Sequence, residues 1–123
     1  MRKLLLLLGL IAIAYPLELS ARDLVKVIQS KDNRDTYYVW RDSIDKRGNI
    51  AYWTDEFVRY GINSKLEEHY SRENSGDCKN RTRRIQKISD YITGENFSKP
   101  RQLEILTPES VAYSILEYVC SSK

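Results

Sequence analysis

The chain has 123 residues, of which 41% are hydrophobic and 30% are charged, and its formal net charge at neutral pH is +3. This length fits one compact domain, and the interspersed acidic and basic residues are typical of an ordinary solvated surface. One histidine and two cysteines are too few to supply a typical metal site, so we expect neither a metal centre nor a bound cofactor.

The first residues have the organisation of a secretory signal peptide. Arg2 and Lys3 precede an apolar run at residues 4–14, LLLLLGLIAIA, and Pro16 follows it. The run is shorter than the about 20 apolar residues that a membrane-spanning helix needs. The pattern therefore predicts that the protein is exported.

We place the signal peptide at residues 1–21, with cleavage after Ala21, and Ala14 as the second candidate for the cleavage position. The mature domain is then residues 22–123. No cysteine follows the apolar run directly, so we expect no lipid group and no stable membrane anchor after cleavage. The expected location is the periplasm, the medium or the cell surface.

Cys78 and Cys120 are the only cysteines in the chain. In an oxidising compartment, two cysteines are most simply paired in a disulfide. Closing a loop of this length stabilises a domain by about 4 kcal/mol in the chain-entropy model. We prefer this pairing to a metal site, which would need more ligands than His69 adds, and to a reactive thiol at Cys120.

The first half of the domain is predicted to be β-structure. Residues 24–30 alternate apolar and polar side chains, and residues 36–40, TYYVW, are dense in β-branched and aromatic residues. The sequence DKRGN at residues 45–49 predicts a turn, so the flanking segments form a hairpin whose second arm is residues 50–60. One face of that arm carries Ala51, Trp53, Asp55, Phe57 and Arg59.

Two later segments are ambiguous between helix and strand. Residues 64–74, SKLEEHYSREN, fit a short exposed helix or a solvated strand equally well. Residues 78–94, CKNRTRRIQKISDYITG, place apolar side chains at helical spacing but are also rich in threonine and arginine, as edge strands are. Periodicity alone leaves both segments open.

The C-terminal segment predicts a helix. Thr107 is a candidate N-cap, Pro108 suits the first turn, and Glu109 complements the positive end of the helix dipole. Cys120 continues the apolar stripe of this helix, so a disulfide to Cys78 would tether its buried face to the sheet. The stripe consists of Val111, Ala112, Ile115, Leu116 and Val119.

The sequence KNRTRR is the strongest concentration of positive charge. On a strand, Lys79, Arg81 and Arg83 would share one face, with Arg84 on the other. The three residues that share a face, Lys79, Arg81 and Arg83, form with Tyr91 a candidate binding stripe for an acidic protein segment, a polyanionic glycan or nucleic acid. The alternative, which we prefer, is an edge strand protected by its charge against pairing with other chains. We expect no nucleic acid partner.

Catalytic motifs are missing from the sequence. The lone His69 lies in a charged run, and no nucleophile motif or phosphate-binding glycine loop accompanies it. The interpretation is a solvated surface histidine, and we expect no enzymatic activity.

An ordered set of motifs resembles the surface-adhesin protein E family of small exported bacterial proteins. The set comprises YYVWRDSI, then GNIAYW, then DCKNRTRRIQKISDYITG, and finally TPESVAYSILEYVC. The resemblance covers nearly the whole mature chain. It implies an α+β fold, a curved antiparallel β-sheet with one C-terminal α-helix tethered by a disulfide, and it favours a strand at residues 78–93.

The resemblance also implies a function. Named members are adhesins that bind host matrix proteins such as vitronectin and laminin, although this chain lacks their lipidation cysteine. The sequence therefore predicts an exported, non-catalytic binding protein. Its expected role is that of an adhesin-like module that binds extracellular or envelope proteins. The alternative is a periplasmic inhibitor or accessory module that docks on an enzyme or envelope complex. Fold transfers through such a resemblance more directly than function does.

Overall fold

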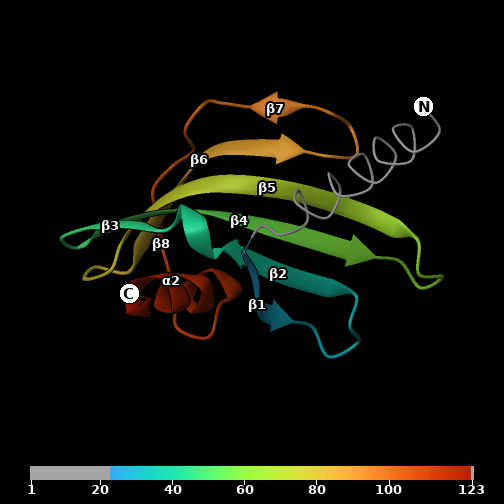
Figure 1. Cartoon of the computed structure of the whole chain (residues 1–123), viewed down its shortest axis with the longest axis horizontal. Helices are drawn as coiled ribbons and strands as arrows, with labels where there is room; N and C mark the ends of the chain where they lie inside the picture. Colours follow the sequence, from blue (N-terminus) through green and yellow to red (C-terminus); the bar gives the residue numbers. More distant parts are fainter. Residues whose placement is uncertain (1–22, 123) are drawn as a thin grey trace, which may run out of the picture.

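The structure is a computed structural model that describes residues 23–122, so the predicted signal peptide at residues 1–21 lies outside the described residues. An eight-stranded antiparallel sheet has the order β1-β2-β4-β5-β6-β7, with β3 beside β4 and β8 beside β6 (Figure 1). The strands are β1 (Leu24–Gln29), β2 (Asp35–Trp40), β3 (Asp45–Arg47), β4 (Ile50–Tyr60), β5 (Leu66–Asp77), β6 (Thr82–Asp90), β7 (Asn96–Phe97) and β8 (Glu104–Ile105). A short 3₁₀ helix, η1 (Arg41–Ser43), precedes β3.

One face of the sheet packs against the C-terminal helix, α2 (Val111–Ser121), and we call it the helix face (Figure 1). The opposite face is the outer face. Strand β4 alternates between the two as predicted, because a strand turns successive side chains to opposite sides. The core between the sheet and α2 consists of Val39, Ala51, Trp53, Leu106, Ile115, Leu116 and Val119.

Helix α2 begins later than predicted. Ser110, not Thr107, is the N-cap, and its hydroxyl oxygen accepts a hydrogen bond from the backbone N–H of Tyr113. Glu109 has a φ of 74°, in the left-handed region, so it cannot belong to the first turn. The prediction of a capping Thr107 is therefore wrong, whereas the apolar stripe and the C-terminal helix itself are confirmed.

Both ambiguous segments contain strands. Strand β5 pairs with β4 from Leu66 to Asp77, with one irregularity in register between Arg59 and Tyr60. Strand β6 begins at Thr82, four residues later than the resemblance implied. Residues 78–81 instead form a turn, in which the Asp77 carboxylate accepts the backbone N–H groups of Lys79 and Asn80.

The turn predicted at residues 45–49 is tighter than expected. Asp45–Arg47 forms strand β3, which pairs with the start of β4. Only Gly48 and Asn49 remain between the two strands, and Gly48 has a φ of 63°, which glycine adopts without the steric cost of a side chain. The prediction of a turn across all five residues is wrong in its extent.

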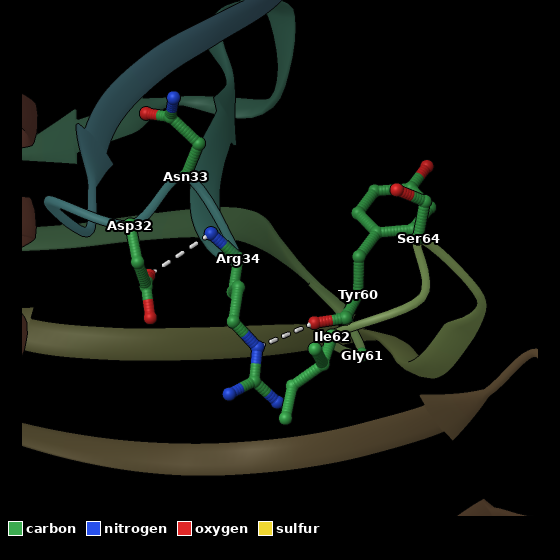
Figure 2. A pocket seen from close by; sticks show the side chains of 7 residues that line it. All are labelled: Asp32, Asn33, Arg34, Tyr60, Gly61, Ile62 and Ser64. Carbon is green, nitrogen blue, oxygen red and sulfur yellow. Dashed lines mark hydrogen bonds between the residues drawn. The ribbon is translucent and has the colours of Figure 1, made fainter.

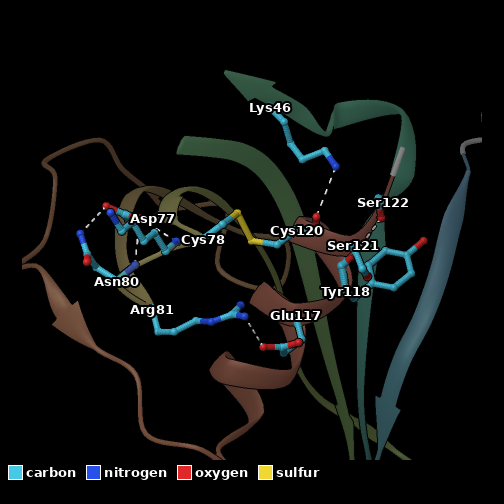
Figure 3. The surroundings of a disulfide bond; sticks show 11 residues. Lys46, Asp77, Cys78, Asn80, Arg81, Glu117, Tyr118, Cys120, Ser121 and Ser122 are labelled. Atoms are coloured by element: carbon cyan, nitrogen blue, oxygen red, sulfur yellow. Dashed lines mark hydrogen bonds and ion pairs between the residues drawn. A yellow bond between two sulfur atoms is a disulfide. The ribbon is translucent and has the colours of Figure 1, made fainter. Parts of the chain in front are cut away.

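The disulfide between Cys78 and Cys120 links the end of β5 to the last turn of α2, with Cα atoms 5.8 Å apart (Figure 3). Two polar contacts flank it: Lys46 Nζ donates to the Cys120 carbonyl at 3.3 Å, and Arg81 pairs with Glu117 at 2.8 Å. The predicted tether is confirmed, and it fits an oxidising compartment. Within residues 23–122, the helices fall short of the length and apolar character of a membrane span.

Candidate protein-binding surface

The predicted binding stripe does not form a single surface. Lys79 and Arg81 lie in the turn before β6. Arg83 is on the helix face, only 6% exposed, and pairs with Glu104 at 3.0 Å. Arg81 pairs with Glu117 of α2, so the charges of both arginines are compensated within the domain.

Tyr91, the fourth residue of the stripe, lies on the outer face. Its ring is 4.5 Å from the ring of His69, and its hydroxyl donates to Ser71 Oγ at 3.2 Å. The expectation that Tyr91 would lie beside Arg81 and Arg83 is wrong, because the sheet itself separates them. The outer face instead presents Arg84, which the sequence placed on the opposite side from the stripe.

The outer face is hollowed in two places between β4, β5 and β6. The two hollows have volumes of about 210 and 250 Å³. They lie on the outer face because Ile50 and Tyr52 alternate with buried Ala51 and Trp53 along β4. Side chains at the first include Ser43, Tyr52, Glu73 and Gln86, and those at the second include Ile50, Ser75, Thr82 and Leu103.

Leu103 and Arg101 at this surface were missed by the sequence analysis. Both belong to the connection between β7 and β8, which crosses the edge of β6. Neither lies in a motif, and both the proximity of Leu103 to Ile50 and Ser75 and the bond from Arg101 to β6 depend on tertiary structure. The one available signal was the predicted opposite orientation of Arg84, which pointed away from the stripe.

A hydrogen-bonded cluster extends the outer face toward β2. Glu56 accepts hydrogen bonds from Trp40 Nε1 at 3.0 Å and interacts with His69 Nε2 at 2.7 Å. Within residues 23–122, no hydrogen bond joins His69 to a serine, threonine or cysteine side chain, and no cluster of three potential metal ligands is present. The geometry thus holds the imidazole in place through Glu56 and the Tyr91 ring.

Another hollow, of about 530 Å³, lies at the turns before β2 and after β4, so β5 runs from it toward Cys78 at its other end (Figure 2). It is lined by Asp32, Asn33, Arg34, Tyr60, Gly61, Ile62 and Ser64. Arg34 Nε donates to the Tyr60 carbonyl at 2.9 Å, and Arg34 Nη2 pairs with Glu67 at 3.3 Å. The Ser30 hydroxyl and the backbone N–H of Arg34 hold the pKa of Asp32 below its ordinary value. Arg34 thus connects the turn between β1 and β2 to the turn between β4 and β5. Ile62, in the second of these turns, is 94% exposed.

Beyond α2, the helix face is filled by its own side chains. The Phe57 ring lies 4.6 Å from the Tyr37 ring and 5.2 Å from the Tyr70 ring, measured between centroids. Burial raises the pKa of both tyrosines. The hydrogen bond to Asp35 raises the pKa of Arg59 above its ordinary value. The side chains in this half of the helix face therefore contact one another.

Comparison with models of known protein families finds no matching family, and a search of curated protein sequences finds no significant match. The resemblance to the surface-adhesin protein E family stays a prediction.

Proposed function

We propose that this chain is an exported, non-catalytic domain that binds another protein through the outer face of its sheet. The observation that carries the proposal is the outer face itself, which is hollowed and carries half-exposed aromatic side chains. Tyr52 is 43% exposed and Tyr91 is 50% exposed. Tyrosine and arginine are enriched at protein interfaces, because they bury large areas while keeping a hydrogen-bonding group.

Export is supported by two independent features. The N-terminal sequence has the pattern of a signal peptide, and the Cys78–Cys120 disulfide fits an oxidising compartment. The resemblance to the surface-adhesin protein E family supports an adhesin-like role, with host matrix proteins such as vitronectin and laminin as the proposed partner class.

A second candidate function is favoured by the turn between β4 and β5. Ile62 stands almost fully exposed there, on a turn braced by the Arg34–Glu67 ion pair. A rigid turn with one exposed apolar side chain suits insertion into a cleft, since little conformational entropy is lost on binding. This feature fits a periplasmic inhibitor or accessory module that docks on an enzyme or envelope complex.

Binding of the oxidised chain to immobilised vitronectin and laminin tests the proposal. We compare the wild type with two variants, Tyr52→Ser plus Tyr91→Ser on the outer face and Ile62→Ser on the exposed turn. Weaker binding by the outer-face variant alone supports the proposed surface. Weaker binding by Ile62→Ser alone favours the second function. If the folded wild type binds neither protein, matrix adhesion is withdrawn.

A further inference from the structure

The arginines of the domain differ in one respect that the sequence does not reveal. Each arginine within residues 23–122 forms an ion pair with a carboxylate, except Arg84 and Arg101. Both exceptions are exposed, and neither side chain makes a hydrogen bond in the described part of the chain. A fold that pairs its other arginines leaves two guanidinium groups available for an external carboxylate.

Arg84 lies on the outer face of β6, and the backbone of Arg101 runs along that strand. In the register of the sheet, Arg84 of β6 lies opposite Ser75 of β5. Arg101 is fixed beside it, because its backbone N–H donates to the carbonyl of Ile85 at 2.9 Å. Arg84 is a residue of β6, and Arg101 is hydrogen-bonded to the next residue, Ile85, so the two arginines are neighbours although they are far apart in the chain.

Arg84 also lies between the two hollows of the outer face. Thr82, two residues before it, lines one hollow, and Gln86, two residues after it, lines the other. Ile50 and Leu103 give the second hollow an apolar lining, and Leu103 is 54% exposed. A ligand at Arg84 therefore meets a positive charge and an apolar hollow together.

Acidic groups near these two arginines are already engaged. Glu73 lies 3.9 Å from Lys87, and Glu104 pairs with Arg83. The Asp77 carboxylate accepts backbone N–H groups in the turn before β6. None of these carboxylates forms an ion pair with Arg84 or Arg101, so both guanidinium groups stay unpaired within the described residues.

We propose that this surface binds an acidic segment of a partner protein, with carboxylates at Arg84 and Arg101 and an apolar side chain in the hollow beside Ile50 and Leu103. Arginine suits this role, since its planar guanidinium binds a carboxylate through two parallel hydrogen bonds. The apolar hollow favours a protein segment over a polyanionic glycan, which has no side chain to fill it. The inference rests on the proposed function and names the chemistry of its partner.

The test uses a labelled short peptide in which glutamates flank a central leucine, measured by fluorescence anisotropy with the oxidised chain. A matched peptide carries glutamine in place of glutamate. We expect saturable binding of the acidic peptide, weakened by added salt, and at least about tenfold weaker binding of the glutamine peptide.

Two paired variants locate the site. Arg84→Gln plus Arg101→Gln should weaken binding by about tenfold or more. Lys31→Gln plus Lys65→Gln removes the same charge from exposed turns at the other end of the sheet and should leave binding unchanged. Leu103→Ser tests the apolar hollow separately and should weaken binding of the leucine peptide.

Three outcomes would overturn the inference. The first is that the glutamine peptide binds as tightly as the acidic peptide. The second is that the double lysine variant loses as much affinity as the double arginine variant. The third is that a heparin oligosaccharide binds and the acidic peptide does not. If the acidic peptide fails to bind while matrix proteins still bind through Tyr52 and Tyr91, the inference fails and the proposed function stands. If neither ligand binds the folded chain, both fail.

Discussion

Asp55 and Arg72 lie directly opposite each other on β4 and β5 and form an ion pair with a distance of 2.8 Å between Asp55 Oδ1 and Arg72 Nε. The Asp55 side chain is 1% exposed, and its other oxygen accepts hydrogen bonds from Trp53 Nε1 and Asn74 Nδ2. One carboxylate therefore satisfies donors from three side chains. Its charge raises the pKa of Arg72 against the opposing effect of burial.

Replacing Asp55 by alanine should destabilise the domain by about 3–5 kcal/mol, because the guanidinium of Arg72 would stay buried without a partner. Urea unfolding followed by tryptophan fluorescence measures the loss. Asp45→Ala is the matched control, since it breaks an exposed ion pair with Arg47 that should contribute less than about 1 kcal/mol. Similar losses in the two variants would contradict a special role for the buried pair.

The disulfide should make a large contribution to stability. Cys78 and Cys120 are separated by 42 residues in the sequence, so the double variant Cys78→Ser plus Cys120→Ser should lose about 4 kcal/mol of unfolding free energy. We would measure urea unfolding of both proteins with and without a reductant. Reduction should shift only the wild type, and free thiols should be undetectable in the denatured, unreduced wild type. Two free thiols would contradict the tether.

Gly76 is required by the close approach of the core to β5. A Cβ atom at this position would lie 2.8 Å from Leu116 Cδ1 and 2.9 Å from Trp53 Cζ3, and both side chains are buried. Gly76→Ala should therefore cost about 1–3 kcal/mol through overpacking. Adding Leu116→Ala should give a total loss smaller than the sum of the single losses, because each change relieves the other.

Gly94→Ala is the comparison for this effect. Gly94 has a φ of 77° with open space around it. Its replacement by alanine should therefore lower the unfolding free energy by about 1–2 kcal/mol, the cost of placing a side chain on a left-handed backbone. Thermal unfolding of the single and double variants would distinguish the two causes. Additive losses for Gly76→Ala and Leu116→Ala would contradict overpacking.

Two elements of the fold, strand β4 and helix α2, were predictable from sequence period alone. Alternation along residues 50–60 assigned Ala51, Trp53 and Phe57 to one face, which the structure buries, and helical spacing assigned Ile115 and Val119 to an apolar stripe, which lies in the core. Both patterns are local and follow from the geometry of strand and helix. The short strands β7 and β8 were not predicted, because two residues are too few to show any period.

The candidate surface was less predictable, because ion pairing depends on residues distant in the sequence. Arg83 is compensated by Glu104 and Arg81 by Glu117 of α2. Arg81 also has a φ of 56°, which ends the alternation that the stripe assumed. A run of charges therefore reveals where the sequence is basic, whereas the fold determines which charge remains available.

Acid should destabilise the domain through aspartates that accept hydrogen bonds in turns. The backbone N–H of Asn80, followed by that of Lys79, holds the pKa of Asp77 below its ordinary value of 3.8. The backbone N–H groups of Thr93 and Ile92 lower the pKa of Asp90 in the same way. Since both pKa values are lower in the folded state, their stabilising contribution is complete above 3.8 and is lost as the pH falls below it.

Measuring the urea midpoint between about pH 5 and pH 2.5 tests this dependence. The wild-type midpoint should fall as the turn aspartates become protonated, and Asp77→Asn should make the decline shallower. Asparagine keeps a side-chain oxygen that accepts the N–H groups of Lys79 and Asn80, so the turn itself is retained. Asp42→Asn, at an exposed carboxylate that accepts no hydrogen bond in the described chain, controls for the change in net charge. An identical decline in the wild type and Asp77→Asn would show that protonation of Asp77 is not linked to folding.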